Sequence, residues 1–102
     1  MKTKAYTVDG SDRFLVFPVE TEEDLKSVER FVGSDYRETG SGGPGVRSEG
    51  EVIPVEVGNR IVHTSATPQL PVYIQETEYQ SSYLVYDEGY FNDVFKEVRV
   101  AR

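Results

Sequence analysis

The sequence predicts an α+β domain with a mainly antiparallel, curled β-sheet of five to seven strands and one helix packed on it, at about 22–32. A chain of 102 residues can form one domain with one modest core. Its β-branched and aromatic residues gather in short runs separated by turn residues, a pattern typical of antiparallel sheets. A single segment combines apolar residues at helical spacing with a strong helix-start signal.

Two strands are expected before the helix. Residues 5–8 and 13–19 are β-type runs, and residues 9–12 between them have turn chemistry. The second run is almost continuously apolar, which favours a strand that is covered on both faces or one near the centre of the sheet. Pro18 should lie at its end, where a missing N–H breaks no ladder hydrogen bond.

The helix is expected to begin after Thr21, a good N-cap residue. Asp24 stands three positions later, where it can complete a short capping box. Gly33 is placed to end the helix. One apolar stripe at helical spacing should face the sheet, formed by Leu25, Val28, Phe31 and Val32.

A glycine-rich segment follows, and it is predicted to be a flexible loop within the single domain of residues 1–102. Residues 39–50 hold five of the nine glycines. Such a segment has little apolar surface to bury, so it cannot readily offset the entropy lost on ordering.

The second half reads as a succession of strands. Residues 51–57 form a strand that Pro54 assigns to a sheet edge. Gly58 and Asn59 favour a two-residue hairpin loop into a strand over 60–64. The remaining expectations are strands over 72–75, 82–86 and 96–100, a turn over 87–89 and one helical turn over 90–95.

The composition narrows the function classes. There is no cysteine and one histidine, which excludes disulfides, thiolate chemistry and a multi-histidine metal site. No apolar run approaches the roughly 20 residues of a membrane span, and the N-terminus lacks the apolar stretch of a secretory signal. We therefore expect a non-enzymatic cytoplasmic protein with no cofactor, no metal and no catalytic residue.

Two residue groups could carry chemistry, but each has a simpler interpretation. His63 shares a strand face with Ser65, but no acid is placed by sequence to orient its ring, which favours a surface or half-buried histidine. Glu76 and Glu78 would share a face in an extended segment, where paired carboxylates can act as acid and base or bind a cation. No further ligand stands at a fixed offset from them, so a solvated rim is favoured.

The charge distribution points to a docking surface. The net charge is −7, and no Lys or Arg occurs between Arg60 and Lys96, a stretch that holds seven of the twelve aromatic residues. Tyrosine suits interfaces because it buries a large area and keeps a polar tip. The alternative is a soluble rim on a strand-rich half. The predicted partner-binding residues are Tyr73, Glu76, Glu78, Tyr79, Tyr83, Tyr86, Asp87, Glu88 and Tyr90.

Three segments resemble small phage and prophage accessory proteins of uncharacterised role. Glu23-Asp24-Leu25 with Phe31-Val32-Gly33 resembles their helix, and residues 57–62 resemble their hairpin. Tyr83-Leu84-Val85-Tyr86, followed by Phe91 and Phe95, resembles their aromatic ending. The resemblance implies an accessory protein that acts in the host cytoplasm, and it implies no catalytic residue.

These observations predict a module that binds and modulates or inhibits a host or phage protein with a basic surface. A nucleic-acid-handling enzyme with a basic groove is the sharpest version. Direct binding to nucleic acid is not expected, because an acidic domain repels phosphates, and neither is membrane binding. Alternatives are a small-molecule-binding protein, with Arg13, Arg47 or Arg60 as anchors, and a phage connector or tail subunit. Homo-oligomers could form through sheet edges.

Overall fold

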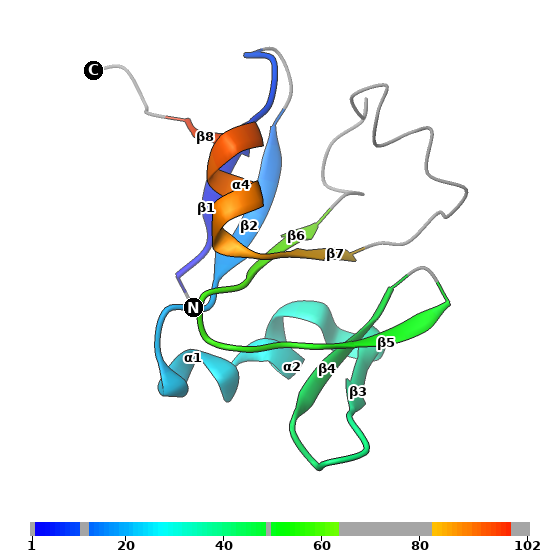
Figure 1. Cartoon of the computed structure of the whole chain (residues 1–102). Coiled ribbons are helices and arrows are strands. Elements are labelled where there is room, and N and C mark those ends of the chain that lie inside the picture. Colours follow the sequence, from blue (N-terminus) through cyan, green and yellow to red (C-terminus); the bar gives the residue numbers. More distant parts are fainter. Residues whose placement is uncertain (1, 11–12, 49, 64–82, 99–102) are drawn as a thin grey trace.

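The computed structural model describes residues 2–10, 13–48, 50–63 and 83–98, which form two antiparallel sheets (Figure 1). The prediction of a mainly antiparallel β architecture with few helices is confirmed. The expected single curled sheet is wrong, because five strands form one sheet in the order β7-β6-β2-β1-β8 and three form another in the order β3-β4-β5. The strands are β1 (Lys4–Thr7), β2 (Phe14–Pro18), β3 (Tyr36–Glu38), β4 (Pro44–Ser48), β5 (Glu51–Pro54), β6 (Arg60–His63), β7 (Tyr83–Tyr86) and β8 (Lys96–Glu97).

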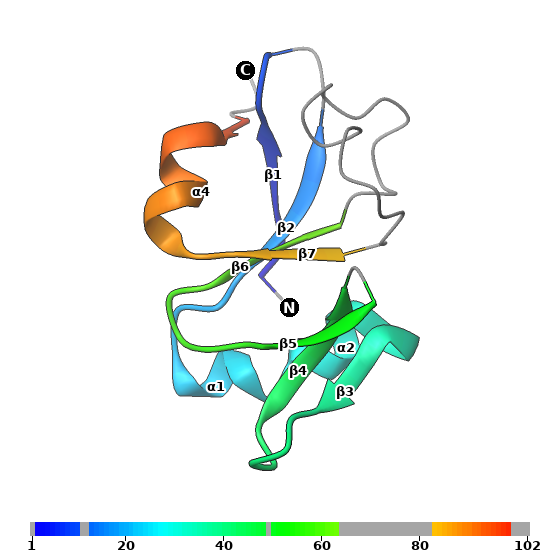
Figure 2. The ribbon, with the colours of Figure 1, turned by 45° about the vertical axis from the view of Figure 1, so that its right-hand side comes forward.

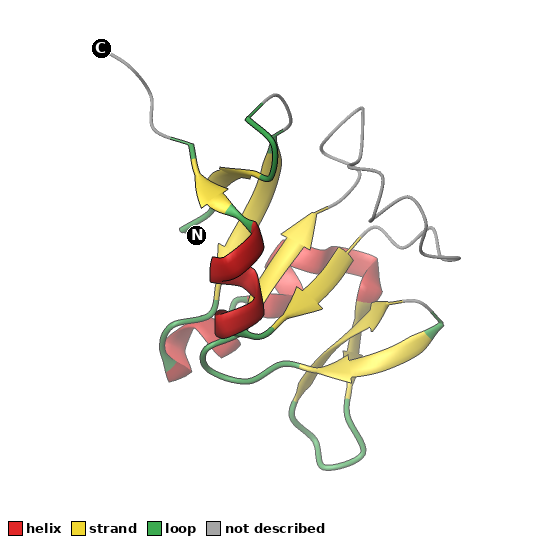
Figure 3. Cartoon of the chain, turned by 45° about the horizontal axis from the view of Figure 1, so that its top comes forward, coloured by secondary structure: helices red, strands yellow, loops and turns green. Residues whose placement is uncertain are grey.

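The five-stranded sheet is covered on both faces, and each face has its own apolar cluster. Alternation along β2 sends Phe14 and Val16 to one face and Phe17 to the other. Helix α4 (Glu88–Val94) covers the first face, and α1 (Glu22–Leu25) and α2 (Val28–Val32) lie on the opposite side (Figures 2 and 3). Strand β2 lies at the centre of this sheet, as predicted, and residues 16–18 are buried, whereas Leu15 is 37% exposed.

The expected helix over 22–32 is interrupted. It divides into α1 and α2, with a 3-10 turn, η1 (Gly33–Asp35), after them. The N–H groups of Lys26 and Ser27 bond the carbonyl groups three residues earlier, which tightens the chain between the two helices. The capping box of Thr21 and Asp24 is present, and Gly33 caps α2 with a φ of 60°. The expected apolar stripe packs in the second cluster.

The helix α4 is longer than the single helical turn over 90–95 that the sequence predicts. The predicted turn over 87–89 is instead the beginning of α4, because the Asp87 side chain caps the helix. Its Oδ1 accepts a hydrogen bond from the N–H of Tyr90 at 2.8 Å. Phe91 and Phe95 then reach the first core cluster, where their rings stack 4.6 Å apart.

The glycine-rich segment 39–50 is not a loop throughout, because β4 occupies residues 44–48. Val46 is fully buried in the second cluster, and β4 pairs with β3 and β5. A turn over 39–43 joins β3 to β4, closed by hydrogen bonds between Thr39 and Gly43. A single well-placed apolar residue and ladder pairing on both sides of β4 account for this difference from the prediction.

The expected hairpin at Gly58 and Asn59 is also wrong, because β5 and β6 belong to different sheets. Residues 56–59 form a turn in which the Asn59 side chain accepts a hydrogen bond from the N–H of Glu56, and Gly58 adopts a φ of 104°. The turn docks on Val19 through two backbone hydrogen bonds. The chain therefore passes from one sheet to the other at this point.

The two proline predictions are confirmed, since Pro18 ends β2 and Pro54 lies on the edge strand β5. Strand β8 lies at an edge of the larger sheet, next to β1. The predicted strand over 72–75 lies outside the described residues, as do residues 64, 82 and 99–100 of the other predicted strands.

Candidate functional site

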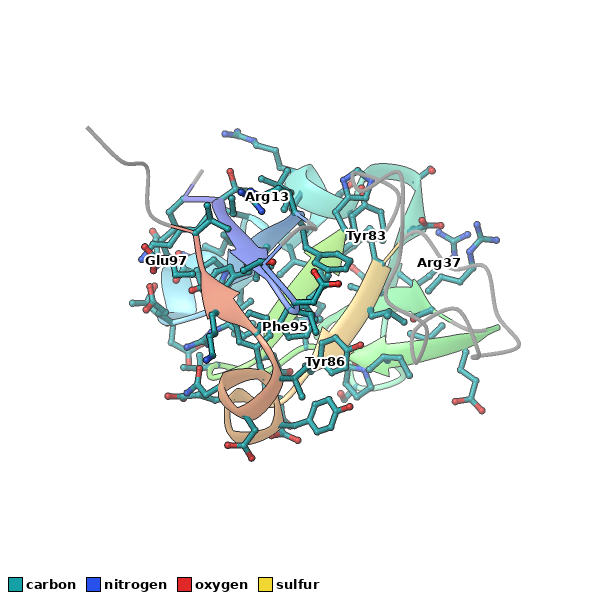
Figure 4. The ribbon with its side chains drawn as sticks, turned by 90° about the horizontal axis from the view of Figure 1, so that it is seen from above. Arg13, Arg37, Tyr83, Tyr86, Phe95 and Glu97 are labelled. Atoms are coloured by element: carbon teal, nitrogen blue, oxygen red, sulfur yellow. The ribbon has the colours of Figure 1, made fainter. Side chains whose placement is uncertain are left out.

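Two tyrosines on consecutive elements form the centre of the candidate site. Tyr86 ends β7, and Tyr90 lies one turn into α4. Their rings stack with centroids 5.3 Å apart and an interplanar angle of 21°. Tyr90 is 47% exposed, whereas Tyr86 is half-buried against Phe95. Figure 4 shows Tyr86 beside α4. The pair therefore has an anchored inner ring and an exposed outer one.

Two carboxylates flank this pair. Asp87 is held by its capping bond to Tyr90, and Glu88 is exposed in the first turn of α4. Negative charge is favourable at this end of a helix, so both residues stabilise the element that carries them. We call Tyr86, Asp87, Glu88 and Tyr90 the α4 face.

An exposed apolar residue lies next to the α4 face. A Cβ placed on Gly58 would be 4.0 Å from Oε2 of Glu88, so the 56–59 turn adjoins this face. Val57 in that turn is 45% exposed. The sequence prediction missed Val57, because the expected hairpin placed it inside a strand.

Tyr83 is not part of the α4 face. Alternation along β7 sends it to the opposite side of the sheet, into the second cluster. There its ring stacks on His63 at 4.7 Å, and its hydroxyl donates a hydrogen bond to the carbonyl oxygen of Phe31. The structure therefore brings together four of the nine predicted residues and separates Tyr83 from them. Tyr73, Glu76, Glu78 and Tyr79 lie outside the described residues.

Burial shifts the acid–base properties of this second aromatic group. Desolvation lowers the pKa of His63 below its ordinary value and raises the pKa of Tyr83, to which the negative charge of Asp35 adds. Both side chains therefore favour their neutral forms at pH 7. Their neutrality and stacking suit a structural role at the junction of β6, β7 and α2.

Among the residues that the structure describes, no group of three or more His, Asp or Glu side chains could hold a metal ion. Ser48, which the sequence prediction passed over, is buried and donates a hydrogen bond from Oγ to the carbonyl oxygen of Tyr83 at 2.7 Å. It joins β4 to the edge of the larger sheet, which is a structural task.

Comparison with known proteins gave no match: no family model, curated protein or solved structure is significantly similar to this chain. In the ranges that the structure describes, none of the helices has the length and apolar character needed to cross a membrane.

Proposed function

We propose that this chain is a non-enzymatic interaction module that docks its α4 face on a basic surface of a partner protein. The observation that carries the proposal is the exposed ring of Tyr90, stacked on Tyr86 and flanked by the carboxylates of Asp87 and Glu88. The sequence between Arg60 and Lys96 holds no Lys or Arg. Arg60 itself pairs with Tyr86 across the sheet and donates hydrogen bonds to the carbonyl oxygens of Gly58 and Asn59.

The chemistry of this face suits arginine and lysine side chains. A guanidinium group can lie over a tyrosine ring and interact with a neighbouring carboxylate at the same time. The Tyr86–Tyr90 stack and the capping bond of Asp87 hold the groups in place before binding, which reduces the entropy cost of association. The net charge of −7 accelerates encounter with a basic partner.

The proposed partner is a host protein in the cytoplasm, and the proposed effect is to modulate or inhibit it. The resemblance of residues 83–86, Phe91 and Phe95 to phage accessory proteins supports this setting. A nucleic-acid-handling enzyme is the preferred class of partner. Its basic groove, which binds phosphates, would also attract the carboxylates of the α4 face.

A pull-down with matched variants tests the proposal. The wild-type chain, Tyr90→Ala, Glu88→Arg and the control Glu29→Arg are immobilised and exposed to bacterial lysate at about 0.1 M and about 1 M salt, where screening differs strongly. Glu29 is an exposed acid on α2, which lies on the opposite side of the larger sheet from α4, so its substitution makes the same charge change away from the α4 face. Captured proteins are identified by mass spectrometry.

The expected result is one protein with a basic surface, captured by the wild type and the Glu29→Arg control and released at high salt. Both α4-face variants should bind it at least roughly tenfold more weakly, as expected for an interface anchor. Equal capture by Tyr90→Ala, Glu88→Arg and the wild type would show that the α4 face is not the contact. Absence of any partner at either salt concentration would also count against the proposal.

A further inference from the structure

The outer face of the three-stranded sheet carries exposed arginines in an acidic chain. Val46 and Ser48 of β4 face the buried side of this sheet, so Arg47 between them points to the other side, where Gly45 also lies. Strand pairing places Arg37 opposite Gly45, Pro54 opposite Gly45 on the other flank, and Val52 opposite Arg47. We call Arg37, Gly45, Arg47, Val52 and Pro54 the outer sheet face.

The two arginines of this face are held in position by neighbouring oxygen atoms. Nη1 of Arg37 donates hydrogen bonds to the carbonyl oxygens of Ser34 and Tyr36, both at 2.7 Å. Nη2 and Nε of Arg47 donate to Oδ1 of Asp35 at 2.8 and 3.2 Å. The Arg47 side chain is still 57% exposed, whereas that of Asp35 is 13% exposed. Solvent therefore meets the cations rather than the carboxylate.

At the centre of the outer sheet face Gly45 is buried beneath its neighbours, and the exposed surface around it is partly apolar. Gly45 contributes no side chain there, and a Cβ at this position would meet the carbonyl oxygen of Arg37 at 2.8 Å. Val52 beside it is 44% exposed. The face thus combines an exposed apolar residue with positioned cations, as the α4 face combines an exposed tyrosine with carboxylates.

We propose that the outer sheet face binds the α4 face of a second copy of this chain. The two faces are complementary in charge, since Arg37 and Arg47 lie on one and Asp87 and Glu88 on the other. Each also offers exposed apolar surface, Val52 and Pro54 on one face and the Tyr90 ring on the other. The inference rests on the proposed role of the α4 face as a docking surface for basic groups. Here the basic groups belong to the same protein.

The contact joins two different surfaces of the molecule. Arg37 projects from the three-stranded sheet on a side away from Tyr86 and α4 (Figure 4). When two copies join through one such contact, each copy keeps one of its two faces free. Further copies can bind there, so the assembly grows into a ring or a filament, unless two copies can form both contacts with each other at once. Self-association also covers the α4 face, and a second copy therefore competes with any basic partner.

Sedimentation velocity on single-face variants tests this proposal. The basic-face variant is Arg37→Glu, and Arg30→Glu on α2 is its control with the same change in net charge. The acidic-face variant is Glu88→Ala with Tyr90→Ala, which leaves the capping residue Asp87 intact. Each protein is measured alone over a concentration series at about 0.1 M and about 1 M salt, and the two face variants are then mixed. Circular dichroism confirms that each variant folds.

The wild type and Arg30→Glu should associate at low salt, with at least roughly tenfold weaker association at high salt. Each face variant alone should sediment as a monomer, and their mixture should recover association, because one intact face remains on each. A wild type that stays monomeric, a basic-face variant that associates like its control, or a mixture that stays monomeric would overturn the proposal.

The same variants distinguish self-association from the proposed binding of a basic partner protein. Arg37→Glu keeps its α4 face, so it should capture a basic partner at least as well as the wild type. Partner capture without self-association would overturn only the inference about a second copy. Self-association that needs both faces, with no other protein captured, would overturn only the proposed partner.

Discussion

The hydroxyl of Tyr83 donates a hydrogen bond to the backbone carbonyl oxygen of Phe31 at 3.2 Å, across 52 positions of the sequence. Phe31 lies near the end of α2, where helix carbonyl groups lack partners within the helix. The bond therefore satisfies an acceptor at the helix end and ties α2 to the strand β7. The edge-to-face packing of the two rings, with centroids 5.5 Å apart, strengthens the same junction.

Replacement of Tyr83 by Phe should lower the free energy of unfolding by about 1 kcal/mol, because the substitution removes this one hydrogen bond and keeps the ring. Urea denaturation followed by circular dichroism measures the change. Tyr90→Phe is the matched control, since Tyr90 is exposed and its loss of a hydroxyl should change stability by less than about 0.5 kcal/mol. Equal effects of the two substitutions would contradict the assigned role of Tyr83.

Gly45→Ala should destabilise the protein by about 1–3 kcal/mol, the usual cost of forcing extra atoms into a packed site. The added methyl group would meet the carbonyl oxygen of Arg37 at 2.8 Å and the Val52 side chain at 3.0 Å. Gly43→Ala is the control, because its nearest neighbour is 3.6 Å away and its φ is not positive. Thermal unfolding of both variants checks the prediction, which fails if Gly45→Ala is as stable as Gly43→Ala.

Acid should weaken the fold through His63. Burial lowers its pKa below 6.5, so the unfolded chain binds this proton more tightly than the folded one. The contribution of neutral His63 is fully present above pH 6.5 and decreases as the pH falls toward the lowered pKa. We expect the free energy of unfolding to decrease between about pH 7 and about pH 5, a range in which histidine titrates and carboxylates largely do not.

His63→Phe isolates this effect, because it keeps a ring against Tyr83 and removes the titration. Urea unfolding of both proteins across the pH range should show a flatter profile for the variant. Parallel profiles would show that His63 is not the responsible group.

Asp24 should contribute more to the stability of the fold than its ion-pair partner Lys2. Its Oδ2 accepts hydrogen bonds from the N–H groups of Glu20 and Thr21 at 2.9 and 3.0 Å, and it lies 2.7 Å from Nζ of Lys2. Burial alone would raise the pKa of Asp24, but the hydrogen bonds from Lys2 and the two backbone N–H groups outweigh it and lower the pKa.

We expect Asp24→Ala to cost about 1 kcal/mol, in the range of a lost helix cap, and Lys2→Ala to cost clearly less, because an exposed ion pair contributes little to stability. Because the pKa of Asp24 is lowered, its contribution is present above the ordinary carboxylate range and is lost as the pH falls through the lowered pKa. Chemical unfolding of both variants is measured at pH 7 and at about pH 3. Asp24→Ala should lower the free energy of unfolding more than Lys2→Ala at pH 7, and the difference should shrink in acid. A larger loss of stability for Lys2→Ala at pH 7 would contradict the prediction.

Local signals in the sequence determined several features by themselves. The capping box of Thr21 and Asp24, the end of α2 at Gly33 and the edge position of Pro54 depend on a few neighbouring residues, so their chemistry is readable without the fold. The central and largely buried position of β2 followed from an almost continuous apolar run. The acidic, base-free character of residues 61–95 is likewise a property of composition.

The tertiary structure alone decided which sheet each strand joins and which elements pack against one another. The turn at Gly58 and Asn59 is compatible with a hairpin, but its hydrogen bonds to Val19 send β5 and β6 into different sheets. Val46 orders β4 within a glycine-rich segment, because strands on both sides and a core beneath offset the entropy cost.

The separation of Tyr83 from Tyr86 has the same origin. Alternation places the two tyrosines on opposite faces of β7, but only packing determines what covers each face. One is joined to α2 and His63, and the other to Tyr90 beside two carboxylates. Local hydrogen bonds and capping act over a few residues and can be predicted from sequence, whereas sheet membership and surface composition depend on contacts between residues far apart in the chain.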